Sequence, residues 1–90
     1  MERNITKTEK LLVIVRDRNT LIFQGHVEAV SSFNDMGPFD VLPRHANLIS
    51  LIKQAIILHL TDKTKKRIEI TSGVLKVREN KIEVYLGILL

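Results

Sequence analysis

The histidines His26, His45 and His59 are the side chains in this sequence best suited to acid–base chemistry or metal binding. His26 and His59 stand among neighbours that do not bind metals. No cluster of carboxylates accompanies them at the spacing of a metal site. We therefore predict that the protein has no metal site.

The sequence carries no recognisable catalytic constellation. It has no cysteine, which excludes disulfides, thiolate nucleophiles and sulfur-ligated metals, and which is consistent with a reducing compartment. No serine stands in a Gly-x-Ser-x-Gly setting, and neither a phosphate-binding loop nor a His-Glu-x-x-His pair is present. We therefore expect a protein that is not an enzyme and that needs no cofactor.

Basic residues outnumber acidic ones by 14 to 10, which gives a net charge of +4. The densest basic run comprises Lys63, Lys65, Lys66 and Arg67. This run could bind lipid headgroups or a phosphate backbone, but we favour a solvated hairpin tip whose charges discourage edge pairing. Aromatic residues make up 4% of the chain, too few for a base-stacking platform, so we expect no nucleic acid partner.

The length of 90 residues, with 44% hydrophobic and 27% charged residues, indicates one globular domain. Residues 1–10 lack an apolar period and are predicted to be a flexible N-terminal arm, with the folded domain in residues 11–90. The first apolar run, residues 11–15, is shorter than the core of a signal peptide, and no run approaches the length of a membrane span. We therefore expect the isolated protein to be soluble.

Alternation of apolar and polar residues predicts strands along most of the chain. Residues 11–15 suit a strand buried on both faces, residues 23–29 alternate with a period of two, and residues 31–38 are predicted as a loop. Residues 46–60 fit either one face of a helix or a strand. We favour the strand, because isoleucine is frequent throughout and residues 56–60 alternate.

The rest of the sequence continues the strand pattern. A charged turn at residues 62–66 leads into a strand whose inward parity changes after Gly73, and we expect Gly73 to supply a β-bulge. A turn at residues 79–80 precedes a last strand. This spacing predicts an all-β fold, an antiparallel β-sandwich or flattened barrel of about eight to ten short strands. The predicted core consists of Leu12, Ile14, Phe23, Val27, Ala29, Val41, Leu48, Ile56, Leu58, Ile68, Ile70, Leu75, Val77, Ile82 and Val84.

The segment GPFDVLPRHANLISLI, residues 37–52, resembles the signature of a known family. Its matching positions are Gly37, Phe39, Val41, Leu42, Pro43, His45, Ala46 and Leu48. The flanks agree in order, with a "F-x-G-x-V-x-x-V" run from Phe23 to Val30 and a run from Thr71 to Val77 similar to "SGG-F-x-x-V". The chain resembles the N-terminal β-sandwich of the epsilon subunit of F-type ATP synthases, which is called delta in mitochondria.

Several turn formers of the family are replaced in this sequence. Arg44 stands where the family has glycine and Asn47 where it has proline, Gln54-Ala55 replaces a Pro-Gly, and Val74 replaces a second glycine. We expect these changes to reshape loops and to leave the sandwich intact. Family members usually carry a C-terminal helical hairpin that inhibits hydrolysis, and the given sequence has no counterpart. The resemblance therefore does not extend to that inhibition.

The resemblance implies a non-catalytic rotor subunit of the central stalk, with a gamma-like subunit and the c-ring as partners. It implies peripheral association with the cytoplasmic side of the inner membrane, indirectly through the complex. The segment of residues 31–45 is the best candidate contact surface. The residues expected at the interface are Gly37, Pro38, Phe39, Asp40, Arg44 and His45.

Two points stay open at this stage. Phe39 could instead pack inward, Arg44 could be merely solvated, and His45 could be a turn histidine whose ring N–H donates to a backbone carbonyl. The whole chain could also be a free-standing adaptor for protein–protein interaction that keeps the scaffold outside the synthase.

Overall fold

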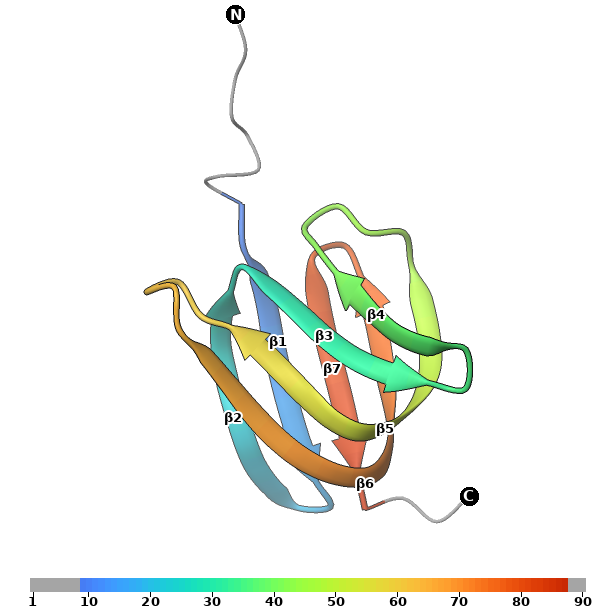
Figure 1. Ribbon diagram of the computed structural model, residues 1–90. Coiled ribbons are helices and arrows are strands. Elements are labelled where there is room, and N and C mark those ends of the chain that lie inside the picture. Colours follow the sequence, from blue (N-terminus) through green and yellow to red (C-terminus); the bar gives the residue numbers. More distant parts are fainter. Residues whose placement is uncertain (1–8, 88–90) are drawn as a thin grey trace, which may run out of the picture.

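The computed structural model describes residues 9–87, and these residues form strands and turns with no helix (Figure 1). The all-β class is therefore confirmed, with seven strands in place of about eight to ten. Most of the predicted N-terminal arm, residues 1–8, lies outside the described residues. The strands are β1 (Leu11–Asp17), β2 (Thr20–Val27), β3 (Ala29–Asn34), β4 (Gly37–Val41), β5 (Leu48–His59), β6 (Lys65–Arg78) and β7 (Lys81–Leu86).

The strands form one sheet in the order β2-β1-β7-β6-β5-β3-β4. Every neighbouring pair is antiparallel except β1 and β7, which are parallel, so the sheet is mixed and not purely antiparallel. Strands β5 and β6 are 12 and 14 residues long and curve strongly (Figure 1). The second half of β6 pairs with β7, whereas the second half of β5 pairs with β3. These two curved strands therefore belong to both layers of the sandwich, which explains why the strand count is low.

The stretch that fitted either helix or strand is strand β5. Its pairing with β6 is interrupted between Lys53 and Ala55, where Gln54 has a left-handed φ of 73°. A residue in this conformation bends the strand, as a β-bulge does. The bend turns β5 from one layer into the other, and Ile52 and Ile56, which flank the bend, are both buried in the core.

The core lies between the two layers and is aliphatic. In β1 the fully buried residues are Leu11, Val13 and Val15, whereas the predicted core residues Leu12 and Ile14 are only half-buried on the outer face. That prediction was wrong by one residue, because five consecutive apolar residues do not show which alternate positions point inward. Of the other predicted members, Phe23, Leu48, Ile68 and Ile70 are partly buried against the core. The rest are buried: Val27, Ala29, Val41, Ile56, Leu58, Leu75, Val77, Ile82 and Val84.

Most of the loop predicted at residues 31–38 is a β-hairpin. Strands β3 and β4 pair from Val30–Val41 to Asn34–Gly37, and the Asn34 side chain accepts the Met36 N–H at 2.9 Å to close the turn. Polar residues fit here because the buried Ser32 hydroxyl donates to the Ala55 carbonyl at 2.8 Å.

Gly73 does not supply the expected bulge conformation. It pairs in register with Ile52 and Leu86, and the irregularity lies in the preceding residues of β6, opposite Gln54. A Cβ at Gly73 would lie 2.9 Å from the Tyr85 carbonyl oxygen. Glycine is needed there because another backbone comes close, not because of its φ angle.

Candidate functional site

Four of the six predicted interface residues lie on strand β4. This strand has a neighbour on one side, β3, so it forms an edge of the sheet. Gly37 starts the strand with a φ of 114°, and Pro38 and Asp40 are exposed. Proline and a charged residue are common on edge strands, since both discourage further pairing. Arg44 and His45 follow in the connection to β5, so all six residues lie close together at this edge.

Phe39 packs inward. Its side chain is partly buried against the hydrophobic core, and its strand neighbours Pro38 and Asp40 point to solvent. Its role is therefore to anchor the edge strand, and an interface here must use the exposed residues beside it.

Asp40 belongs to a polar network that the sequence did not reveal. The Ser31 hydroxyl donates to Asp40 Oδ1 at 2.6 Å, and His59 Nε2 lies 2.8 Å from the same hydroxyl oxygen. Because the single hydroxyl proton is given to the carboxylate, the His59 Nε2–H must be the donor in the second bond. This order is the reverse of a catalytic triad, where the histidine accepts the serine proton. The network therefore braces β4, β3 and β5 and does not activate a nucleophile.

Arg44 is held on two sides by the chain itself. Its backbone N–H donates to Asn80 Oδ1 at 2.7 Å, and its Nε pairs with the Glu9 carboxylate at 3.0 Å. Its φ of 70° is left-handed, the conformation that favours glycine. Arg44 thus adopts a backbone shape that suits glycine, the residue that the family has at this position. Its charge is paired with the Glu9 carboxylate.

His45 forms the local hydrogen bond of a turn histidine. Its Nδ1 lies 2.7 Å from the Ala46 carbonyl oxygen, and since a carbonyl can only accept, Nδ1 carries the proton. Its backbone N–H donates to the Leu42 carbonyl at 3.1 Å. The sequence left open whether His45 has a structural role or an interface role, and these bonds support the structural role. They also fix the shape of residues 42–47.

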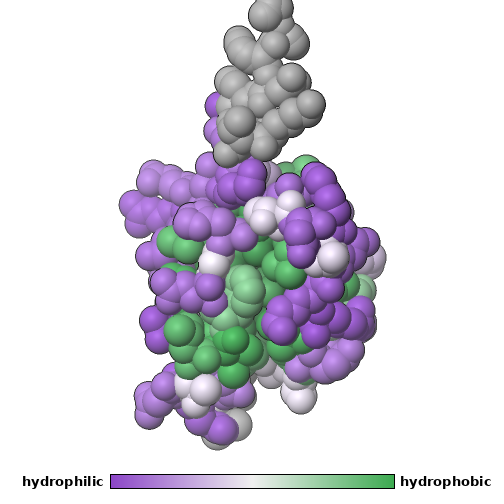
Figure 2. Space-filling view, turned by 90° about the vertical axis from the view of Figure 1, so that its left-hand side faces the viewer, coloured by the Kyte–Doolittle hydropathy of each residue, from purple (hydrophilic) through white to green (hydrophobic). Residues whose placement is uncertain are grey.

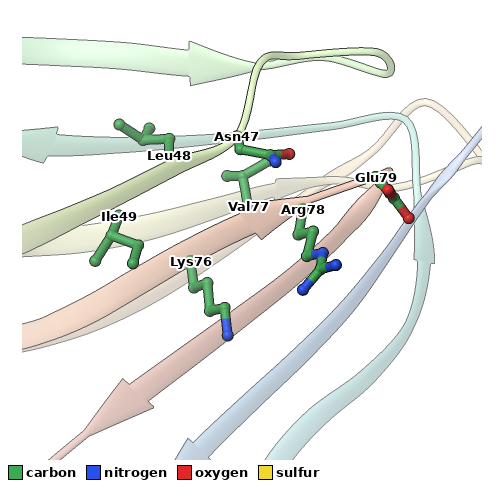
Figure 3. Close-up of a pocket in the computed structure, with 7 residues that line it drawn as sticks. All are labelled: Asn47, Leu48, Ile49, Lys76, Val77, Arg78 and Glu79. Carbon is green, nitrogen blue, oxygen red and sulfur yellow. The ribbon is translucent and has the colours of Figure 1, made fainter.

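A groove of about 480 Å³ adjoins this turn, between the start of β5 and the end of β6 (Figure 3). Ile49, Lys76 and Arg78 point to its open side, while Leu48 and Val77 point inward (Figure 3). Ile49 is 70% exposed, and two strand positions on, Leu51 is 59% exposed. Sequence reasoning missed this groove because it treated apolar residues as core. Outward strand positions occupied by Ile and Leu were the available signal.

The titratable groups with shifted pKa values lie away from this edge. Hydrogen bonds from the Thr64 hydroxyl and backbone N–H lower the pKa of Asp62, and burial followed by repulsion from Glu83 raises the pKa of Tyr85. Among residues 9–87 no group of three His, Asp or Glu side chains comes together as a metal site requires. The described part of the chain also contains no helix that is long and apolar enough to cross a membrane.

Comparison with known proteins identifies the family. Residues 10–87 match the family described as "ATP synthase, Delta/Epsilon chain, beta-sandwich domain". The ATP synthase epsilon chain of Nitratiruptor is 45% identical over 62 residues, which cover 68% of this chain and 48% of that protein. The epsilon chain of Sulfurovum is 38% identical over 64 residues, covering 70% and 50%. The chain thus spans about half the length of these curated relatives.

Solved structures agree with the fold. The Euglena gracilis mitochondrial ATP synthase (OSCP/F1/c-ring) contains a chain that matches with a TM-score of 0.82 and 14% identity, over 90% of this chain and 52% of that one. A chain in the central stalk and c-ring of the Tetrahymena thermophila mitochondrial ATP synthase matches with a TM-score of 0.73 and 11% identity, over 91% and 66%. By sequence and by fold, the chain belongs to the family of the β-sandwich domain of the ATP synthase delta/epsilon chain.

Proposed function

We propose that the chain is a non-catalytic subunit of the central stalk of an F-type, proton-translocating ATP synthase. There it links a gamma-like subunit to the c-ring and takes part in coupling proton flow to ATP synthesis. The family match over residues 10–87 carries this proposal, and the relatives named ATP synthase epsilon chain support it. Within such a complex the chain lies peripherally, on the cytoplasmic side of the inner membrane.

The mechanical properties of the fold suit this role. A subunit held between two larger parts transmits torque only if it resists deformation, and close-packed cores have low compressibility. All seven strands join one continuous sheet that closes around an aliphatic core. Residues 42–47 are tied to the β6–β7 turn through Asn80 and to Glu9 through the Arg44 side chain. The backbone and the Arg44 side chain of the proposed contact surface are therefore held in place by hydrogen bonds and an ion pair to other parts of the chain.

The packing at this edge supports a narrower set of proposed contact residues. Phe39 anchors β4 from inside, Gly37 forms the hairpin turn, and Arg44 and His45 shape the connection to β5 through local bonds. We propose that the exposed side chains beside them make the direct contact with the c-ring: Pro38, Asp40 and Leu42.

Retention of the purified chain on an immobilised c-ring, with and without a gamma subunit, tests this function. Leu42 is 56% exposed, so Leu42→Glu places a charge in the proposed contact without disturbing the core. We expect its retention to fall about tenfold or more, since burying an unpaired charge is costly. Thr71→Glu adds the same charge at an exposed position of β6, where Thr71 lines a groove with Asp17 and Gly87 away from this edge, and serves as the matched control, with retention equal to the parent.

Two outcomes contradict the proposal in different ways. If Leu42→Glu is retained as well as Thr71→Glu, the contact surface is misplaced although the subunit role can stand. If the parent chain binds neither the ring nor the gamma subunit, the stalk role fails, and the free-standing adaptor becomes the better description.

A further inference from the structure

Strand β2 is an unusually unprotected edge of the sheet. It pairs with β1 on one side, with an irregularity at Ile22, and no strand among residues 9–87 pairs with its other side. Natural edge strands are usually short or carry charges or proline, which prevent unwanted pairing. β4 follows this rule with five residues that include Pro38 and Asp40. The first half of β6, which pairs with β5 and leaves its other side free, starts with Lys65 and Lys66. β2 has eight residues, TLIFQGHV, and contains neither proline nor a charged side chain other than a histidine.

The surface beside β2 is hydrophobic. Leu21 and Ile22 are 48% and 41% exposed, and Phe23 is only partly buried against the core. Ile68 and Ile70 of β6 are also partly buried and face the core from the other layer. Figure 2 views this side of the molecule and shows hydrophobic atoms gathered in a band between hydrophilic ones. An apolar surface of this kind usually marks an interaction site.

The first half of β6 runs alongside β2 without pairing with it. At one end, Lys63 and Glu28 form an ion pair at 3.3 Å between the turn before β6 and the residue after β2. At the other end, Arg18 in the turn before β2 and Ile70 of β6 line the same groove, of about 500 Å³. The two unpaired edges therefore lie on the same open side of the sandwich.

The charges on this side are positive. Lys65 and Lys66 are exposed and have no ion-pair partner among residues 9–87, while the neighbouring Arg67 pairs with Glu69 at 2.6 Å. A second copy of the chain is a poor occupant, because β2 carries no acidic side chain that could meet these lysines. A segment with acidic side chains matches these lysines instead.

We propose that β2 accepts an added strand from a partner protein, an extended segment that alternates apolar residues with Asp or Glu. The main chain of that segment pairs with the free edge of β2. Its apolar side chains cover Phe23, Ile68 and Ile70 on the inner face, and its carboxylates, on the outer face, meet Lys65. This is strand addition, in which backbone hydrogen bonds give affinity and the alternate side chains give specificity. The site is on another edge of the sheet from β4 and does not depend on the stalk role.

The test is a titration of the full chain, labelled with ¹⁵N, with a blocked synthetic peptide of alternating valine and glutamate as long as β2. We expect the outward amides of β2 to exchange hydrogen about tenfold more slowly or better when the peptide is bound. Lys65→Glu weakens binding about tenfold or more, since it replaces attraction by repulsion. Lys53→Glu, a charge reversal at a 47%-exposed lysine of β5, is the matched control and leaves the affinity within about twofold of the parent.

Three results would overturn the proposal. The first is no binding of the glutamate peptide, or equal binding of a valine–lysine peptide. The second is protection of the β4 amides in place of the β2 amides. The third is equal weakening by Lys53→Glu and Lys65→Glu, which would indicate nonspecific attraction. If the chain alone forms a dimer with protected β2 amides, the occupant is a second copy and the acidic partner is wrong.

Discussion

Replacing Gly73 by alanine tests how closely β6 and β7 approach each other. The added Cβ would lie 2.7 Å from Leu86 Cδ2 and 2.9 Å from the Tyr85 carbonyl oxygen. The Leu86 side chain can rotate away, but the Tyr85 oxygen belongs to the backbone of β7, which pairs with β6. The two strands must therefore separate by a few tenths of an ångström, and the adjacent core contacts loosen with them.

The size of the effect follows from two opposing contributions. Overpacking a tight site typically costs about 1–3 kcal/mol, whereas alanine in a strand gains about 0.5–1 kcal/mol over glycine through lower unfolded-state entropy. We expect a net loss of about 1–2 kcal/mol in the free energy of unfolding. In a domain of this size each kcal/mol corresponds to about 4–8 °C in Tm.

Urea denaturation of the purified chain measures this effect, with Gly25→Ala as the matched control. At Gly25 the nearest atom to an added Cβ is the tip of the Phe23 side chain at 3.3 Å, which can move. We expect Gly25→Ala to be as stable as the parent within about 0.5 kcal/mol, or slightly more stable. If Gly73→Ala is equally stable, the close approach of the two strands does not constrain position 73 and the argument is refuted.

Three further predictions concern the core, the turn after β4 and the hairpin at β6. Leu58→Ala should lower the free energy of unfolding by about 2–5 kcal/mol in a urea titration, because Leu58 is fully buried; a loss comparable to that of a surface substitution would contradict the assigned core. In a Glu9→Gln background, Arg44→Gly should raise stability by about 0.5–1 kcal/mol, because glycine adopts a φ of 70° without strain; a loss would show that the turn is unstrained. The pKa of Asp62, followed by NMR, should lie below 3.8 and rise in Thr64→Val, which removes the donating hydroxyl. Because the folded-state pKa is lowered, the stabilisation that it reports is present above pH 3.8 and is lost as the pH falls through the lowered value.

The strand pattern of the fold was predictable because alternation is a local signal. β2, the end of β5 and β7 were visible in the sequence as apolar residues two positions apart. The sequence could not predict which residues of β1 point inward, since Leu11 to Val15 are all apolar. Only the register with β2 and β7 selects the inward face. The parallel pairing of β1 with β7 and the curvature of β5 through Gln54 are also tertiary properties, which local periodicity cannot reveal.

The interface predicted at residues 37–40 and 44–45 stays a prediction, and the structure adds the bonds that hold these residues. Four of the six lie on the edge strand β4, and two lie in the connection to β5. The family resemblance could not show that the charge of Arg44 is paired with Glu9, 35 residues earlier, because that contact depends on the folded chain. The bond between Ser31 and His59 was missed for the same reason, as these residues are 28 positions apart. Gln54 and Arg44 further illustrate that left-handed positions need not be glycine when the surrounding sheet fixes the backbone.

The absence of cysteine from the chain makes one measurement especially direct, because an introduced thiol is unique. Asp40→Cys places a thiol on the exposed outer side of β4, and Thr71→Cys places one on β6 in a groove with Asp17 and Gly87, away from this edge. Each thiol is labelled with a thiol-reactive photo-crosslinker, and the labelled chain is illuminated in native membranes. We predict that Asp40→Cys yields a product with the c-ring subunit and that Thr71→Cys does not. Purified synthase that lacks the chain, or a crosslink from Asp40→Cys only to proteins outside the synthase, would contradict this prediction.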